Sequence, residues 1–432
     1  MSSSRAIGFW TAVALVMGNM IGSGVFLLPA SLASYGGLAL AGWLVSATGA
    51  VFLAVVFARL ARLHPDAGGP YAYTRRAFGD LAGFLVGWGY WISVWSGCAA
   101  LAVAFVGYLD PLLPSLVRAP ISAALLAVTA VWVLTAVNMW GMRAAGQVQV
   151  TTTVLKVLPL LVIGVAGAMY FRADHFAVAT VSVRATSHSV LNVTTLTLWA
   201  LLGLESATIP AASVRDPERT IPRATVTGTL VAAAIYIVST IGVMSLVAPA
   251  VLAHTTAPFA DAARVLMGDR AAVVVAVGAA ISCFGALNGW ILVMGQLPLA
   301  IAQDGLFPRM FGRVSSSGTP ASALVIGSVL TTALIAANYS RGLVELFTFI
   351  ITLSTLSTLV PYVFCSLASG MTRRDAAGGL GKIEVASVVA FVFSIGAIIG
   401  AGYEVVFWGF VLLLAGLPVY VWVVRKRVTS AV

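Results

Sequence analysis

Long apolar stretches, separated by short polar segments, follow one another along almost the whole chain of 432 residues. Several of them exceed the ~20 residues that an α-helix needs to cross a lipid bilayer. We therefore predict an all-α integral membrane protein with twelve spans, near residues 8–32, 36–62, 79–108, 119–141, 149–171, 188–212, 223–247, 271–300, 320–338, 343–369, 383–401 and 403–424. No small-residue cleavage pattern ends the first span, so we expect it to be retained.

The composition of the chain indicates the same class. Hydrophobic residues make up 60% of the chain and charged residues only 9%, whereas soluble domains carry about 25% charged residues. Cys98, Cys283 and Cys365 all fall within apolar stretches. We interpret them as small core residues and not as a disulfide framework.

The distribution of Lys and Arg sets the predicted orientation. With both termini in the cytoplasm, 17 of the 24 basic residues fall on the cytoplasmic side, and one, Lys156, lies inside a span. The six on the outer side are Arg118, Arg172, Arg184, Arg264, Arg270 and Arg341. This bias is typical of a multi-pass protein of the cytoplasmic (inner) membrane. The net charge of +10 therefore indicates topology and anionic lipids, and not nucleic-acid binding.

The polar segments between the spans are too short for a soluble domain and show no catalytic spacing. The stretch GGLGKIE at 378–384 lacks the pattern of a phosphate-binding loop, so we do not expect ATP-driven pumping. The four histidines are scattered over loops and helix ends, at His64, His175, His188 and His254. We therefore predict no enzyme activity, no catalytic residue, no metal site and no cofactor.

Two of the predicted spans are interrupted by residues that do not suit a helix in hydrocarbon. GNMIGSGVF at 18–26 holds three glycines, an asparagine and a serine, and LWALLGLESATIPAAS at 198–213 holds Gly203, Glu205 and Pro210. These are the first and sixth spans, as an inverted repeat of five helices would give. Freed N–H groups suit a carboxylate and freed carbonyls suit an ammonium, which together match an α-amino acid. Glycines that serve only close helix packing are the alternative.

Several motifs resemble those of the amino acid/polyamine/organocation transporters, and these are GNMIGSGVFLLPASLASYGG, GGPYAYTRRAFG, TLWALLGLESA, RDPERTIPRAT, APFADAARVLMGD, QDGLFPRMFGRV and STLVPYVF. Within this superfamily the chain resembles the basic amino acid/polyamine antiporters, such as the arginine/agmatine antiporter. The resemblance runs from the first span to about residue 365. It implies a LeuT-like five-plus-five inverted repeat with broken helices 1 and 6, alternating access, and sodium-independent exchange of an amino acid for an amine.

The resemblance also implies the organisation of the chain. Residues 1–432 would form one transmembrane domain, with repeat 1 at about 8–171, repeat 2 at about 188–369 and two extra helices at 383–424. The implied partners are an amino acid or polyamine substrate, the lipid bilayer and, in a homodimer, a second copy of the chain.

Carried over residue by residue, the resemblance predicts a site for the substrate backbone. Ser23 and Gly24 would hold the carboxylate. The α-amino group would meet carbonyls at Met20 and in the segment from Trp199 to Leu202. The ring of Trp199 would close over the bound substrate.

The resemblance predicts side-chain contacts as well. Trp290 would stack on a cationic group of the substrate. The other implied substrate-binding residues are Ser93, Val94, Cys98 and Ser354, and the implied inner gate consists of Tyr90, Glu205 and Tyr362. The antiporter has an asparagine where this chain has Cys98, which is a poor acceptor for a guanidinium. The choice among arginine, other basic and neutral amino acids therefore stays open.

Lys156 and Glu205 are the basic and the acidic residue near the middle of a span. An ionisable group at that depth costs at least ~2.5 kcal/mol, so both are expected to face the protein interior. Proton-coupled members of the superfamily have a lysine at this position, against carbonyls of the broken first helix where relatives bind sodium. At that position, the carbonyls and Glu205 would favour the charged form of the Lys156 side chain. Lys156 would either couple transport to protons or brace the first helix, and Glu205 is the other candidate for coupling.

A secondary transporter is favoured over other functions. The alternative within the same class is a proton-coupled transporter of neutral amino acids that uses Lys156. A channel would need a continuous polar pore or a filter motif, and a membrane enzyme would need clustered His, Asp or Glu near one interface. A transport-derived sensor would carry an added soluble domain.

Overall fold

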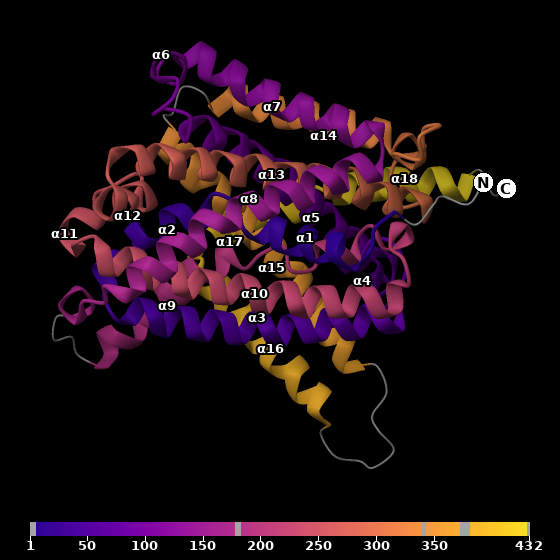
Figure 1. Cartoon of the computed structure of the whole chain (residues 1–432). Coiled ribbons are helices and arrows are strands. Elements are labelled where there is room, and N and C mark those ends of the chain that lie inside the picture. Colours follow the sequence, from indigo (N-terminus) through magenta and orange to yellow (C-terminus); the bar gives the residue numbers. More distant parts are fainter. Residues whose placement is uncertain (1–5, 178–182, 339–342, 372–380, 430–432) are drawn as a thin grey trace.

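The computed structural model describes residues 6–177, 183–338, 343–371 and 381–429, which form a bundle of α-helices (Figure 1). Within these residues, eight spans are long and apolar enough to cross a membrane. They are α3 (Leu38–Leu63), α5 (Asp80–Gly107), α7 (Pro120–Trp140), α8 (Met142–Met169), α10 (Pro217–Leu246), α13 (Asp269–Gln303), α16 (Lys382–Gly400), and α17 (Tyr403–Leu414) together with α18 (Leu417–Thr429).

The first predicted span is broken where the glycines predict it. Helices α1 (Phe9–Met20) and α2 (Gly24–Leu32) meet at a bend of 41°, with residues 21–23 unwound between them. Counted as one span, this pair raises the number to nine within the described residues. The three other predicted spans fall on α9 (Val183–Ala200), α14 (Ala321–Asn338) and α15 (Leu343–Met371), each with a shorter described apolar segment. The total of twelve stays a prediction.

The sixth span is interrupted more extensively than predicted. Helix α9 ends at Ala200, and residues 201–213 form turns with two short 3-10 segments. The predicted interruption at Gly203 is therefore confirmed, and within the predicted span at 188–212 the α-helix itself ends at Ala200. Gly203 has a φ of +101°, which L side chains rarely adopt. Pro210 has no N–H for a helical hydrogen bond, so the segment keeps irregular backbone inside the bundle.

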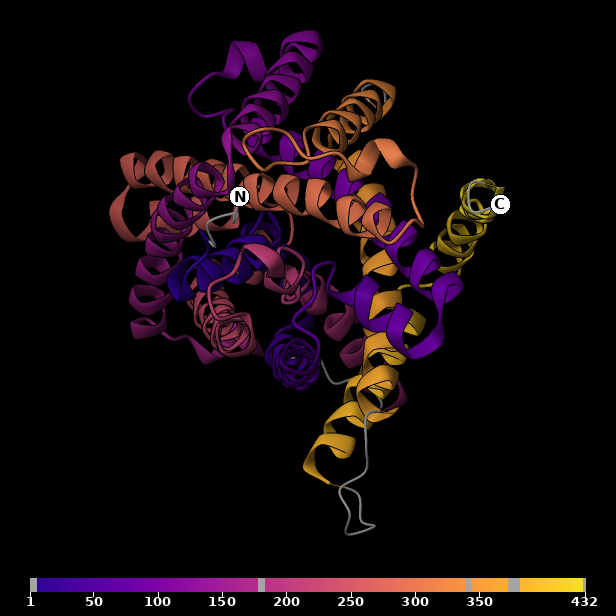
Figure 2. The same cartoon turned by 90° about the vertical axis from the view of Figure 1, so that its right-hand side faces the viewer.

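Two hydrophobic cores hold the bundle together. One surrounds α1, α3, α9 and α10, and the other surrounds α5, α7, α13 and α14. Most of these helices run side by side in Figure 1, and Figure 2 views them from the end where the chain begins and ends. At Gly164 and Gly242, where α8 meets α10, a Cβ would run into the opposite backbone. Such small residues let membrane helices approach closely.

Four short helices of the described chain connect the spans and were not predicted from the sequence. They are α4 (Pro70–Phe78), α6 (Pro114–Val117), α11 (Pro249–Leu252) and α12 (Pro258–Met267). Each begins at a proline, which fits the first turn of a helix because an N–H there would have no helical partner. Helix α4 lies at the same end of the molecule as both chain termini, whereas α6, α11 and α12 lie at the opposite end (Figure 1).

Candidate functional site

A cavity of about 70 Å³ lies beside the break between α1 and α2. Among the predicted site residues, those that line it are Met20, Ser23, Gly24, Ser93, Val94, Trp199, Leu202 and Trp290. The rest of the lining consists of Asn19, Gly22, Gly97, Ala100, Leu101, Ala200 and Thr358. The fold thus brings α5, α9, α13 and α15 together around the break. A cavity of this size holds a few waters, so an amino acid can enter only after a lining side chain moves.

Side chains from α8 and α13 bind the carbonyl oxygens that the unwound turn frees. The ammonium of Lys156, fully buried on α8, donates hydrogen bonds to the carbonyl of Gly18 at 2.7 Å and to that of Ile21. The hydroxyl of Ser282, on α13, donates to Ile21 at 3.2 Å and to Gly22 at 3.1 Å. The predicted contact between Lys156 and the broken first helix is therefore present.

Two polar side chains of the cavity lining have no hydrogen-bond partner among the described residues. They are the Oγ of Ser23, a residue 1% exposed, and both amide atoms of Asn19, a residue 4% exposed. An unpaired buried polar group costs about 1–3 kcal/mol, so the Ser23 hydroxyl in this lining favours a polar ligand. Asn19 was missed as a lining residue from the sequence. Its position within GNMIGSGVF, directly before the break, is the signal that could have identified it.

Two tryptophans border the cavity, and glycines leave room for their rings. The ring of Trp199 lies so close to Gly24 that a Cβ at that position would collide with it. The indole Nε1 of Trp290 donates to the carbonyl of Asn19 at 3.2 Å. Its ring lies against Gly203, where a Cβ would be 3.0 Å from it. The ring of Trp199 therefore covers the start of α2, while Trp290 forms the wall toward the sixth-span break.

Glu205 is fully buried in the unwound segment and lies between two tyrosines. The hydroxyls of Tyr90, on α5, and Tyr362, on α15, each donate to one of its carboxylate oxygens. The N–H of Gly203 donates to the Tyr362 hydroxyl at 3.3 Å. The three predicted gate residues thus come together. Support of the Lys156 ammonium by Glu205 is not seen, because the carboxylate binds tyrosines and the ammonium binds carbonyls.

Two predicted substrate-binding residues do not join the described lining. Cys98 is fully buried in the core around α5, and it is Gly97 and Leu101 that line the cavity from this helix. Ser354 belongs to the part of α15 whose side chains lie outside the described residues. One turn further along, Thr358 lines the cavity.

Comparisons with known proteins agree over nearly the whole chain. A family model described as amino acid permease matches residues 7–413. The cadaverine/lysine antiporter of Escherichia coli (strain K12) is 34% identical over 93% of this chain and 91% of its own length. The putative arginine/ornithine antiporter of Bacillus subtilis (strain 168) is 32% identical over 99% of this chain and 98% of its own length. These relatives are transporters and not enzymes.

The fold has a solved counterpart as well. The crystal structure of MhsT in complex with L-phenylalanine superposes with a TM-score of 0.64 at 14% identity, over 90% of this chain and 97% of that chain. The predicted all-helical, LeuT-like fold is therefore confirmed. Taken with its apolar helices and its relatives, this multi-pass membrane chain belongs to the amino acid permease family.

Proposed function

We propose that this chain exchanges a cationic amino acid for an amine across the cytoplasmic membrane, without sodium. One observation carries the proposal. The break between α1 and α2 places Ser23, whose buried hydroxyl has no partner among the described residues, in the lining of a cavity that Trp290 also borders, while the ammonium of Lys156 binds carbonyls of the same break. The names of the relatives, a cadaverine/lysine antiporter and a putative arginine/ornithine antiporter, support this substrate class.

The substrate carboxylate would bind at the start of α2. The first N–H groups of a helix have no partner within the helix, and the positive end of the helix dipole attracts anions. Ser23 supplies a hydroxyl beside these groups, and Gly24 lets the ligand approach the backbone once the Trp199 ring moves. Carbonyls at Met20 and in the segment after Trp199 would accept from the α-amino group.

Lys156 would take the place of a sodium ion. Its ammonium binds the carbonyls of Gly18 and Ile21, so it ties the end of α1 to the unwound turn. Carbonyls that already hold an ammonium are not free to coordinate a metal cation. We therefore expect exchange at the same rate in sodium and in choline media.

The buried cluster of Tyr90, Glu205 and Tyr362 would form the inner gate. It joins the sixth-span break to α5 and α15. The end of that break also contacts the loop before α4, because the N–H of Gly68 donates to the carbonyl of Ile209 at 3.0 Å. The cluster therefore lies toward the α4 end of the molecule. On this proposal the α4 end and both termini are cytoplasmic, in agreement with the positive-inside bias. The two repeats would run from about residue 8 to 171 and from about residue 188 to 369.

Proteoliposomes that contain the purified protein test the exchange. Labelled lysine or arginine should enter vesicles loaded with cadaverine, agmatine or the unlabelled amino acid, and should not enter empty vesicles. Ligands that bind should also raise the melting temperature by mass action, which ranks substrates independently of transport. Equal uptake into empty vesicles, or uptake that requires sodium, would contradict the proposal.

Replacement of Trp290 tests whether the substrate is a cation. Trp290→Leu should weaken binding of a cationic substrate by about 0.5–2 kcal/mol, the range of cation–π attraction, and should affect a small neutral amino acid much less. Trp290→Phe is the matched control, because it also loses the N–H bond to Asn19 but keeps an aromatic face. Equal losses for cationic and neutral ligands, measured by thermal shift, would assign Trp290 a structural role only.

A further inference from the structure

The turns that lead into α5 and α13 have the same construction, although they lie at opposite ends of the molecule. In each, an arginine in the last turn of a short helix precedes a glycine with positive φ and then the aspartate that begins the long helix. The residues are Arg75, Gly79 and Asp80 in the first turn, and Arg264, Gly268 and Asp269 in the second.

Their geometry agrees in detail. The glycines have φ of +88° and +81°, and each glycine N–H donates to the arginine carbonyl at 2.9 Å. The arginine Nε donates to the aspartate Oδ1 at 2.7 Å in the first turn and at 2.9 Å in the second. Because α4 and α12 lie at opposite ends of the bundle (Figure 1), the two turns lie where equivalent positions of an inverted repeat are expected.

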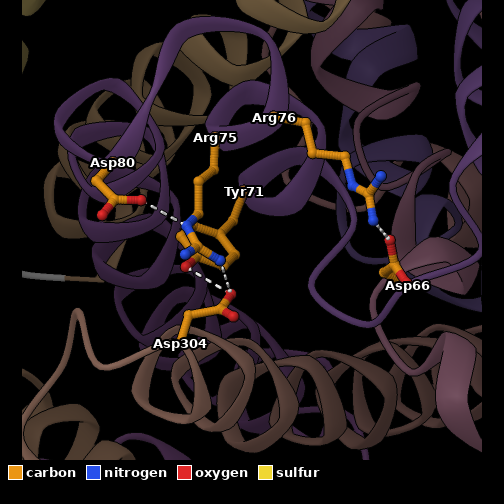
Figure 3. A network of polar contacts seen from close by, with 6 residues as sticks. All are labelled: Asp66, Tyr71, Arg75, Arg76, Asp80 and Asp304. Atoms are coloured by element: carbon orange, nitrogen blue, oxygen red, sulfur yellow. Dashed lines mark hydrogen bonds and ion pairs between the residues drawn. The ribbon is translucent and has the colours of Figure 1, made fainter.

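The first turn is locked to the far end of α13. The guanidinium of Arg75 also binds Asp304, the residue after α13, with an Nη1–Oδ2 distance of 2.7 Å. The hydroxyl of Tyr71 donates to the same carboxylate at 2.9 Å (Figure 3). Burial, and then the charge of Asp304, raise the pKa of the Tyr71 hydroxyl above its usual range, so it remains a donor. We call this group, Tyr71, Arg75 and Asp304, the α4 latch.

The start of α4, next to the α4 latch, contacts the segments that carry Glu205 and Tyr362 of the gate cluster (Tyr90, Glu205 and Tyr362). A Cβ at Gly69, in the loop before α4, would collide with Thr208 of the sixth-span break. The thiol of Cys365, one turn along α15 from Tyr362, lies 3.8 Å from the carbonyl of Pro70. Movement of α4 would therefore uncover Cys365 and release the segment that carries Glu205.

The second turn has the same parts, but they are paired differently. Asp304 directly follows α13, and Asp110 lies three residues after the end of α5. We therefore take a bond between Arg264 and Asp110 as the counterpart of the α4 latch. Instead, Arg264 binds Asp261 of its own helix at 2.6 Å, and Asp110 binds Arg118 at 3.0 Å. The ring of Phe26 lies between the end of α5 and α12, because its centroid is 5.9 Å from that of Tyr108 and 5.2 Å from that of Phe259.

We propose that these turns are alternating latches of the transport cycle. In the state described here the α4 latch is formed and its counterpart at α12 is open. In the opposite state Arg75 releases Asp304, α4 withdraws from the gate cluster, and Arg264 exchanges Asp261 for Asp110. Each arginine keeps its bond to the aspartate of its own turn, and the turn acts as the hinge. Only the second carboxylate that the arginine binds changes between the two states.

Labelling of Cys365 tests the α4 latch without any substrate, so its outcome does not depend on the proposed exchange reaction. In a background with Cys98→Ala and Cys283→Ala, Asp304→Asn should raise the rate of maleimide labelling at Cys365 roughly fivefold, as expected for a partly exposed ion pair worth about 1 kcal/mol. Asp304→Glu should restore the original rate. The matched control is Asp66→Asn, which breaks the Arg76–Asp66 pair beside α4 without touching α13 (Figure 3).

Cross-linking tests the counterpart at α12. With the three native cysteines replaced by alanine, Arg264→Cys combined with Asp110→Cys should cross-link with a short bifunctional maleimide, and adding Asp304→Asn should increase the yield. Asp110→Asn alone should lower Cys365 labelling in the first assay. A cross-link yield that Asp304→Asn leaves unchanged, or labelling of Cys365 that rises equally with Asp66→Asn, would overturn the proposal.

Discussion

Replacing Gly24 by valine should abolish substrate binding while the protein still folds. A Cβ at this position would collide with the Trp199 ring, and the two branches of valine would also fill the space that a carboxylate needs. The loss of charge-assisted hydrogen bonds alone, about 1.5–3 kcal/mol, should lower affinity by about 10- to 150-fold, and the space that valine fills should lower it further. Thermal-shift titration and counterflow measure this loss.

A matched control is available in the same chain. At Gly396, within α16, a Cβ would have no atom within 4 Å. Gly396→Val should therefore leave affinity and counterflow unchanged, which separates the effect of the site from the general effect of valine in a membrane helix. A Gly24→Val protein that binds with wild-type affinity would exclude the start of α2 as the carboxylate site.

Replacing Lys156 by methionine should weaken binding at every pH and lower the melting temperature. Methionine is similar in length but donates no hydrogen bond, so the Gly18 carbonyl loses its ammonium and Ile21 keeps only Ser282. An unpaired buried carbonyl costs about 1–3 kcal/mol. This cost corresponds to about a 5- to 150-fold decrease in the population of the state with α1 held against α8. Binding and melting curves between acidic and alkaline pH measure both effects.

Thr153→Val is the control for the Lys156 variant. Thr153 lies one turn before Lys156 and donates to the carbonyl of Ala14 at 3.2 Å, so its loss removes a neutral bond to the same helix. It should have a much smaller effect. If the Lys156→Met protein binds normally but its transport no longer varies with pH, Lys156 carries the coupling proton. If its pH profile is unchanged, Glu205 becomes the candidate for that role.

The amino-acid sequence by itself determined the membrane class, the approximate positions of the spans and the two breaks. Apolar runs near 20 residues can bury a helix only in lipid or in a large core. The glycines of GNMIGSGVF and Gly203 are local signals, because they act through the backbone of their own segment. The resemblance of neighbouring motifs also located Trp199, Trp290 and Lys156 near the breaks, and all three border or bind them.

Only the tertiary structure decided which polar groups meet. The sequence did not show that α9 ends at Ala200, that Cys98 faces the core, or that Asn19 is buried without a partner. Nor did it show that Arg75 binds Asp304 across the bundle. Hydrophobic patterns report burial along one element. These pairings depend instead on how separate helices pack, and on which side chain then lies within hydrogen-bond distance of an unpaired donor or acceptor. The α4 latch follows from that packing.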